Sequence, residues 1–143
     1  MSVILTQTDT TVGFLSQDSL KLQEIKSRNS SKPFIKVYSS LKAFKEDKNR
    51  VPSSQKSRIR RSKQTTFIIK NRALRIAKSS LNSSILRKYE WNYSTSANES
   101  GKNFNREFCE SKADIIIEDI NSLHEGKASS LYIINSRKME RLR

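Results

Sequence analysis

Chemically reactive side chains are scarce in this sequence. Among its 143 residues there is one cysteine, Cys109, and one histidine, His124. A single cysteine excludes an internal disulfide and a cluster of thiolate metal ligands. With only one histidine, the sequence also disfavours a zinc site or a Cys-His nucleophilic couple. We expect Cys109 to be a core residue and His124 to lie in a surface loop, and we assign neither of them a chemical role.

Long apolar runs are missing as well. No stretch reaches the length of a membrane-spanning helix, and residues 1–7 contain no basic segment followed by a long apolar one. We therefore expect a cytoplasmic protein that does not enter a membrane. Leu, Ile, Val and Phe still make up 35 of the 143 residues, which is enough apolar material for a single domain spanning residues 1–143.

Acidic residues are half as frequent as basic ones. The chain has 28 Lys and Arg against 14 Asp and Glu, a net charge of +14, and such a charge attracts polyanions whatever the fold. Nucleotide phosphates, RNA and anionic membranes are the candidate partners. The charge is densest over residues 56–63, where five of eight residues are basic. Such a run is either a solvated face or a contact with a polyanion, and nothing in it reads bases.

Apolar periodicity predicts helices and strands in irregular alternation. We expect a hairpin at residues 65–77, because only Asn71 and Arg72 separate its two strands. The isoleucines from Ile115 to Ile117 predict a strand that is buried on both faces. The pattern gives an α/β or α+β fold with a mixed sheet. The expected helices cover residues 16–28, 41–48, 79–88 and 103–111, and the expected strands cover 2–6, 34–38, 65–70, 73–77, 91–94, 113–119 and 131–134.

Two polar loops are candidate binding segments. Residues 94–101 place small hydroxyl and amide side chains behind two aromatic residues and end on a glycine, which suits close contact with a polar ligand. A plain polar turn has the same composition. Thr8, Asp9 and Thr10 follow the first expected strand, and ligands of open α/β sheets gather beyond the carboxyl ends of strands.

Basic residues form a second candidate feature. Lys26, Arg28 and Lys32 gather near the end of the first expected helix, where they are either a solvated helix end stabilised by the helix dipole or ligands of an anion. Arg75 lies within an otherwise apolar strand. A buried guanidinium at that position needs an anionic partner, whereas one on a solvated face needs none.

These segments resemble one known family. The loop at residues 94–101 is similar to the Ser-x-Asn signature loop of the YrdC-like threonylcarbamoyl-AMP synthase family, and Lys26-Ser27-Arg28 with Lys32-Pro33 is similar to its Lys-x-Arg…Lys-Pro motif. The chain is shorter than is usual for this family. Weaker matches follow in family order at residues 8–13, 75, 113–119, 126–130 and 142–143, and departures occur at Gln7, Val12, Ala77 and residues 62–64.

The resemblance implies a YrdC-like twisted sheet with a basic groove. It also implies a nucleotidyltransferase that joins L-threonine, bicarbonate and ATP into threonylcarbamoyl-AMP and pyrophosphate, for the threonylcarbamoyladenosine modification of tRNA. No residue would act as a covalent catalyst, and Mg²⁺ is expected with the triphosphate. The implied ATP contacts are Lys26, Arg28, Lys32, Ser96, Asn98, Ser129 and Arg143, and the implied threonine contacts are Thr8, Thr10, Arg75 and Thr95.

A second reading assigns the chain to another class of protein. A shortened chain that departs from the family at its substrate side is also consistent with a non-catalytic module, which would bind double-stranded RNA or a nucleotide on the same fold. Pyrophosphate release from ATP that requires both threonine and bicarbonate distinguishes the synthase from the binding module.

Overall fold

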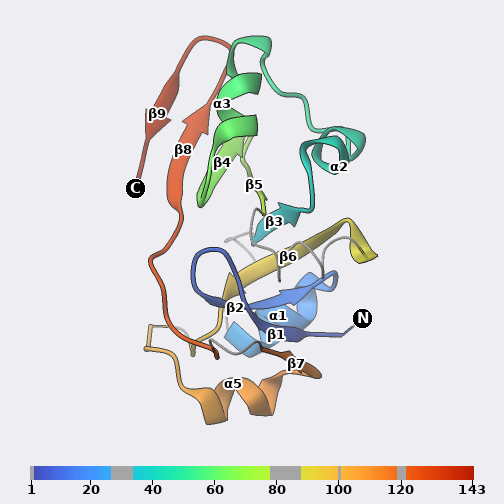
Figure 1. The fold of residues 1–143 in the computed structure, drawn as a ribbon, viewed down its shortest axis with the longest axis vertical. Helices are drawn as coiled ribbons and strands as arrows, with labels where there is room; N and C mark the ends of the chain where they lie inside the picture. Colours follow the sequence, from blue (N-terminus) through green and yellow to red (C-terminus); the bar gives the residue numbers. More distant parts are fainter. Residues whose placement is uncertain (1, 27–33, 78–87, 100, 119–121) are drawn as a thin grey trace.

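The computed structural model describes residues 2–26, 34–77, 88–99, 101–118 and 122–143. Its strands form one nine-stranded sheet in the order β7-β1-β2-β6-β3-β5-β4-β8-β9 (Figure 1). The strands are β1 (Ile4–Gln7), β2 (Val12–Ser16), β3 (Ile35–Tyr38), β4 (Thr65–Ile69), β5 (Arg72–Ile76), β6 (Trp91–Ser96), β7 (Ile115–Ile117), β8 (Ser130–Ile134) and β9 (Met139–Arg141). The helical elements are α1 (Ser19–Lys26), α2 (Leu41–Glu46), the 3-10 turn η1 (Ser53–Gln55), α3 (Lys56–Arg61) and α5 (Arg106–Lys112).

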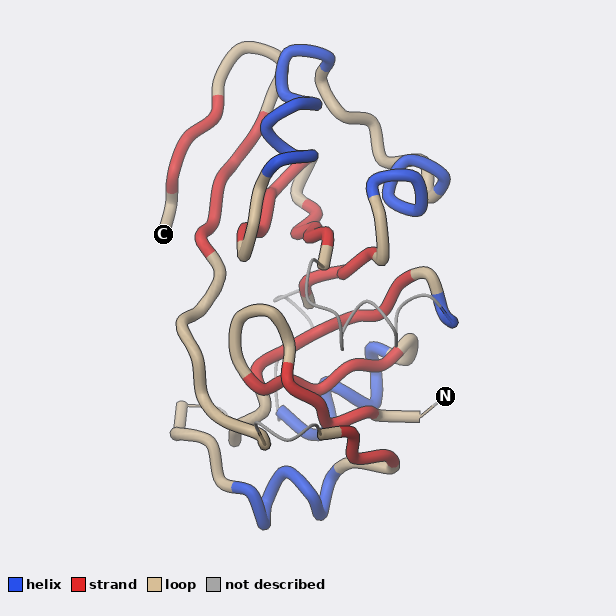
Figure 2. The backbone as a smooth tube through the Cα atoms, in the orientation of Figure 1, coloured by secondary structure: helices blue, strands red, loops and turns tan. Residues whose placement is uncertain are grey.

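The sheet is mixed, as the sequence predicts. Three strand pairs are parallel (β1 with β7, β3 with β5 and β4 with β8), and the other pairs are antiparallel. β4 and β5 form the expected hairpin, but its turn residues are Lys70 and Asn71, one position before the expected Asn71 and Arg72. Their φ values are positive, 51° and 66°. Such values match the tight turn that joins twisted strands. Residues 122–129 cross from the part of the sheet that holds β1 to the part that holds β8 (Figure 2).

Several elements differ from the expected ones. β2 and β9 were not predicted as strands, and residues 56–61 form α3, where only a basic run was predicted. β9 has no apolar alternation, and its backbone pairing with β8 holds it in place instead. β2 is buried along its whole length, so it lacks the alternation of a half-exposed strand. The helix expected at residues 79–88 lies outside the described residues except for its last residue.

The isoleucine strand β7 lies at one end of the sheet, and the prediction that both its faces are buried is wrong. Ile115 is 39% exposed and Ile116 is 43% exposed. An apolar run shows that a strand is favoured, but it does not show whether another layer covers it.

Within the described segments, no helix combines the length and the apolar character needed to cross a lipid bilayer.

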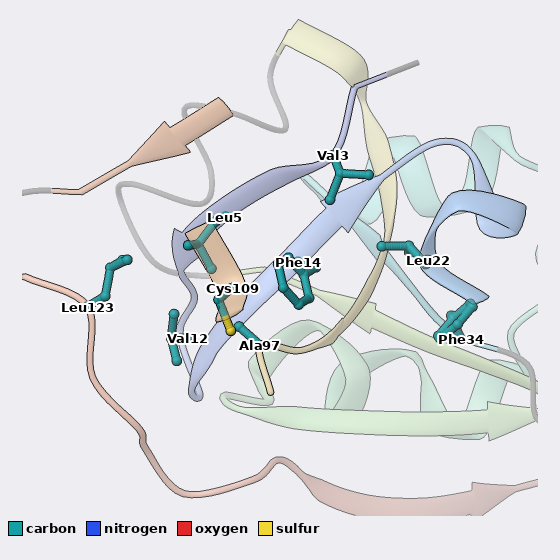
Figure 3. Packing of buried hydrophobic residues seen from close by; sticks show 9 residues of the cluster. All are labelled: Val3, Leu5, Val12, Phe14, Leu22, Phe34, Ala97, Cys109 and Leu123. Carbon is teal, nitrogen blue, oxygen red and sulfur yellow. The ribbon is translucent and has the colours of Figure 1, made fainter. Parts of the chain in front are cut away.

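The part of the sheet that holds β1, β2 and β6 packs on an apolar core. Cys109 of α5 is fully buried there, as expected, and burial raises the pKa of its thiol because the charged form loses its hydration. The cluster, drawn in Figure 3, comprises Val3, Leu5, Val12, Phe14, Leu22, Phe34, Ala97, Cys109 and Leu123. It packs α1 and α5 against the strands that carry the candidate loops.

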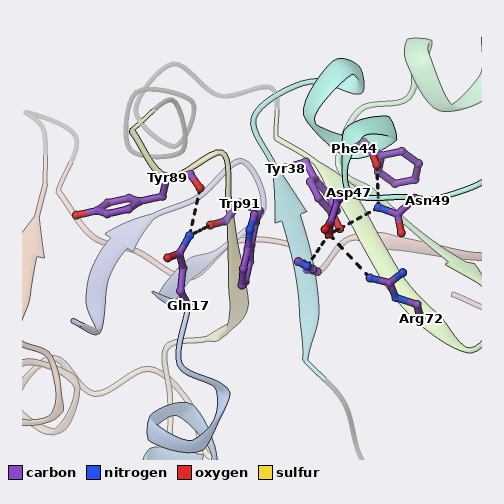
Figure 4. Close-up of polar contacts among 9 residues, drawn as sticks. Gln17, Tyr38, Phe44, Asp47, Asn49, Arg72, Tyr89 and Trp91 are labelled. Carbon is purple, nitrogen blue, oxygen red and sulfur yellow. Dashed lines mark hydrogen bonds and ion pairs between the residues drawn. The ribbon is translucent and has the colours of Figure 1, made fainter.

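A polar cluster centred on Asp47 fixes the end of α2 against β3 and β5 (Figure 4). The Asp47 carboxylate accepts hydrogen bonds of 2.6 Å from both Lys36 Nζ and Tyr38 Oη, and Arg72 Nη2 lies 4.0 Å away. Lys36 Nζ is also 3.9 Å from the centre of the Trp91 ring. Desolvation alone would raise the pKa of Asp47, but the hydrogen bonds and the charges of Lys36 and Arg72 outweigh it and lower that pKa.

Asp47→Asn is expected to lower the free energy of unfolding by up to about 1 kcal/mol, because the carboxylate is partly exposed and its ion pair is partly screened. Since the folded pKa lies below the ordinary value of 3.8, this contribution is present above that pH and is lost as the pH falls below it. Urea unfolding at pH 7, 5 and 3 should therefore show a difference from the parent that shrinks at pH 3.

Glu46→Gln is the matched control. Glu46 is the adjacent acid, and its contact with Lys42 is 3.8 Å long between two well-exposed side chains. It should change stability by much less at every pH. Equal effects of the two substitutions would contradict a structural role for the Asp47 cluster.

Candidate functional site

A polar cavity of about 250 Å³ collects most of the residues singled out in the sequence. Its walls come from the β1–β2 turn, β3, β5, β6, the crossing segment and the last residue of the chain. Seven of the eleven predicted contacts line it, although their roles remain predictions: Thr8, Thr10, Arg75, Thr95, Ser96, Ser129 and Arg143.

The β1–β2 turn holds its hydroxyl groups in a fixed arrangement. Thr8 Oγ1 donates a 2.5 Å hydrogen bond to the carbonyl oxygen of Thr11 and accepts one of 3.2 Å from the backbone nitrogen of Thr10. Gly13 lets β6 approach, since a Cβ there would lie 3.1 Å from Thr8 Cγ2 and 3.2 Å from the carbonyl oxygen of Thr95. The hydroxyls of Thr8 and Thr10 thus lie 3.2 Å apart at the cavity wall.

The crossing segment closes over the same turn. The backbone nitrogen of Gly126 donates a 2.9 Å hydrogen bond to Thr11 Oγ1, and a Cβ at Gly126 would lie only 2.0 Å from the carbonyl oxygen of Thr10. Only glycine fits this contact without movement of the backbone. Gln64 Nε2 donates a 2.6 Å hydrogen bond to the carbonyl oxygen of Asp9, so the turn is held from two sides.

Arg75 of β5 forms a buried ion pair with Asp9 of the turn. Arg75 Nη2 lies 3.6 Å from Asp9 Oδ1, and the side chains are 4% and 6% exposed. Arg75 Nη1 donates to Thr10 Oγ1 at 3.2 Å, whereas Arg75 Nε and both Asp9 oxygens have no hydrogen-bond partner among the described residues. Burial lowers the pKa of Arg75, the charge of Arg143 lowers it further, and Asp9 opposes both effects.

A second arginine reaches the cavity from the end of the chain. Arg143 Nε donates to the carbonyl oxygen of Ser129 at 3.0 Å, and its Nη2 donates to Ser129 Oγ at 3.3 Å. Ser129 Oγ lies 2.8 Å from Thr66 Oγ1, which anchors it to β4. Two guanidinium groups and several hydroxyls in one cavity suit an anionic ligand with several oxygen atoms.

The polar loop after β6 is held by a buried lysine. Lys26 Nζ donates to the carbonyl oxygens of Ser96 at 3.0 Å and Asn98 at 2.8 Å, and to Asn98 Oδ1 at 2.8 Å. Asn98 Oδ1 also accepts from Ser96 Oγ at 2.6 Å, and its Nδ2 donates to the carbonyl oxygens of Glu99 and Lys102. Lys26 and Asn98 therefore shape the loop, a role that the sequence analysis did not anticipate.

Of the other predicted contacts, Lys26 and Asn98 do not line the 250 Å³ cavity. Asn98 lines a smaller cavity of about 200 Å³, which shares Thr11, Ser96 and Ala128 with the first one and so adjoins it. The predicted contacts of Lys26 and Asn98 with ATP stay predictions. Arg28 and Lys32 lie outside the described residues.

Sequence reasoning missed three residues that build the site. Asp9 stands between two predicted threonine contacts, so the motif itself marked its position, and the need of Arg75 for an anionic partner pointed to an acid. Thr11 and Gln64 gave no comparable signal, because their contacts exist only once distant segments meet.

The Asp9–Arg75 pair should be strongly coupled. Asp9→Asn leaves a buried guanidinium without its counter-charge and is expected to cost on the order of 3 kcal/mol of unfolding free energy. The double variant with Arg75→Gln should cost less than the two single variants together, by about 1–3 kcal/mol. Arg72→Gln, at an exposed position of the same strand, should show no coupling with Asp9→Asn. Additive effects in urea unfolding would contradict the pairing.

Similarity to known proteins is found in structure alone. The sequence matches no protein-family model and no curated protein. A double variant of Sua5 from P. abyssi matches with a TM-score of 0.79 at 16% identity, over 99% of this chain and 49% of Sua5. A Sua5 structure with L-threonine bound gives 0.75 at 17% identity, over 99% of this chain and 50% of that one.

Two further structures share the fold. E. coli YciO matches with a TM-score of 0.77 at 13% identity, over 99% of this chain and 82% of YciO. Full-length HypF with phosphate and nucleotide bound gives 0.76 at 14% identity, over 99% of this chain and 22% of HypF. The chain thus spans about half the length of Sua5. Its nine-stranded mixed sheet has the fold of the Sua5/YrdC proteins.

Proposed function

We propose that this chain is an L-threonylcarbamoyladenylate synthase of the cytoplasm, which makes threonylcarbamoyl-AMP for the modification of tRNA. The observation that carries the proposal is the buried Arg75, whose Nε has no partner among the described residues, in a hydroxyl-lined cavity that a second arginine also enters. The proposal is supported by a Sua5 structure complexed with L-threonine and by a HypF structure in a phosphate- and nucleotide-bound form, because both contain this fold.

Threonine would occupy the part of the cavity beside β5. Its carboxylate would pair with Arg75, and the hydroxyls of Thr8, Thr10 and Thr95 would hydrogen-bond the rest of the molecule. The Asp9 carboxylate does not line the cavity. We therefore assign it a positioning role: it holds the Arg75 guanidinium in place and balances its charge.

The reaction needs positioning and charge stabilisation more than a nucleophilic side chain. The threonine amine and bicarbonate form a carbamate and release water. A carbamate oxygen then attacks the α-phosphorus of ATP, and the new P–O bond forms as the bond to pyrophosphate breaks. Bringing two anionic reactants together accounts for much of the barrier, which cationic and hydroxyl groups in a fixed cavity lower.

The triphosphate would lie toward Ser129, Arg143 and the loop that Lys26 holds, with Arg28 and Lys32 as further proposed contacts. Ser96 and Asn98 would bond phosphate or ribose oxygens from the adjoining cavity. Mg²⁺ would bind to the phosphate oxygens, whose charge it neutralises. The described residues include no group of three or more His, Cys, Asp or Glu side chains that could hold a cation, so we propose phosphate and water as its ligands.

A non-catalytic module for RNA or nucleotides is the second candidate. Identity of only 13–17% to the structural neighbours favours a divergent role. Two departures from the family motifs, Gln7 and Val12, do not line the 250 Å³ cavity, however, although Val12 lines the smaller one. Gln7 Oε1 accepts a 2.9 Å hydrogen bond from the backbone nitrogen of His124, and Val12 is buried in the core.

The synthase proposal predicts pyrophosphate release only when ATP, L-threonine and bicarbonate are all present. Arg75→Gln should reduce this release by at least about 100-fold, because a charge-assisted contact to the substrate carboxylate is lost in a desolvated site. Arg72→Gln is the matched control, since it alters an exposed arginine of the same strand and should keep nearly full activity. Both variants should be assayed where circular dichroism shows that they are folded.

Two results would exclude synthesis. One is pyrophosphate release that does not depend on threonine. The other is tight ATP binding with no pyrophosphate release when ATP, L-threonine and bicarbonate are all present, which would favour the binding module.

A further inference from the structure

A separate cavity lies at the end of the molecule that carries the β8–β9 turn, away from α5 (Figure 1). We call it the tip cavity. Its walls are the loop after α2, the ends of β4 and β8, and the turns that follow these two strands. Its volume is about 550 Å³, against 250 Å³ for the cavity of the candidate site, and the two share no lining residue. The proposed synthesis therefore does not use the tip cavity.

Aliphatic residues supply much of its lining. Ile69 and Ile134 belong to the buried core that α2 and α3 cover, and Val51 packs against the same core. Ile133 also lines the tip cavity, and 38% of its surface is exposed. An apolar ligand that covers this side chain would remove it from water, which is favourable. The tip cavity is thus suited to a ligand with an apolar body.

The charged part of the lining has one sign only. Arg50 and Lys70 line the tip cavity, and they also line an adjoining cavity of about 170 Å³ together with Lys48 and Arg72. No described residue that lines either cavity is an acid. Arg72 lies 4.0 Å from Asp47, whereas the side chains of Lys48, Arg50 and Lys70 have no partner among the described residues. Three cations without counter-charges favour an anionic ligand.

These cations stand on a fixed backbone. Asn49 is buried, and its Nδ2 donates hydrogen bonds of 2.9 Å to Tyr38 Oη and 2.8 Å to the carbonyl oxygen of Phe44. This anchor fixes the chain between Lys48 and Arg50. The third cation belongs to the tight β4–β5 turn. A preformed arrangement lowers the entropic cost of gathering positive charge around a ligand.

We propose that the tip cavity binds a small organic anion with an aliphatic body and a carboxylate head. The body would lie against Val51 and Ile133, and the head would pair with Arg50 and Lys70. The volume falls in the range of about 300–1,000 Å³ that is typical of small-molecule sites, which are mostly apolar with a few polar groups that fix orientation. A polyanion without an apolar part would leave the aliphatic lining in water.

Isothermal titration calorimetry with octanoate, octan-1-ol and acetate tests the proposal. The parent protein should bind octanoate at one site. It should bind octan-1-ol, which has the body but no charge, about tenfold more weakly, because the charge-assisted contacts are missing. Acetate, which has the head but no body, should show no detectable binding.

Two variants separate the roles of charge and apolar contact. Arg50→Gln, Lys70→Gln should weaken octanoate binding by about tenfold and leave octan-1-ol binding unchanged. Ile133→Thr should weaken the binding of both molecules, because it removes apolar surface but keeps the branched side chain that a strand favours. Circular dichroism should show that both variants are folded.

A matched double variant supplies the control. Lys102→Gln, Lys112→Gln removes the same charge from exposed positions that do not line the tip cavity, and it should bind octanoate as the parent does. Equal losses in the two double variants, or octan-1-ol binding as tight as that of octanoate, would overturn the inference. Binding of phosphatidylglycerol vesicles or of an acidic, leucine-containing peptide without binding of octanoate would overturn it in favour of a membrane or a protein segment.

Discussion

A guanidinium group that is removed from water needs a counter-charge, and the site of this protein is arranged around that need. Arg75 is a buried residue of β5 that pairs with Val37 of β3, and its partner Asp9 comes from a turn that belongs to the other part of the fold. The turn must therefore reach across to β5. Gly126 and Gln64 hold it there, one by leaving space for the Thr10 carbonyl and the other by a hydrogen bond to the Asp9 carbonyl. The cavity is the space that remains beside this contact.

The proposed chemistry agrees with the scarcity of reactive side chains. A reaction in which one substrate attacks the other needs no protein nucleophile, so a chain with a buried Cys109 and a surface His124 lacks nothing that the reaction requires. What it does require is fixed positive charge and hydroxyl groups in a desolvated cavity. Arg75, Arg143 and the threonines of the β1–β2 turn provide these groups.

Local chemistry determined which parts of the structure could be predicted from the sequence. The β4–β5 hairpin was predictable because two strand-like apolar runs stand only two residues apart, although its turn lies one position earlier than expected. For Arg75 the sequence left two environments open, a buried one with an anionic partner and a solvated one, and the structure has the first. The exposure of Ile115 and the hydrogen bonds of Asn98 could not be predicted in the same way. Each depends on what a distant segment covers or contacts, and composition does not encode that.

The crossing segment at residues 122–129 has a consequence for how the protein responds to its ligand. The cavity draws its walls from four successive strands of the sheet, β2, β6, β3 and β5, and from this segment. A bound molecule would touch all of these walls at once, so it would act as a non-covalent cross-link between the two parts of the fold. A ligand that binds only the folded chain raises the free energy of unfolding. The protein would therefore be most stable when its substrates are abundant.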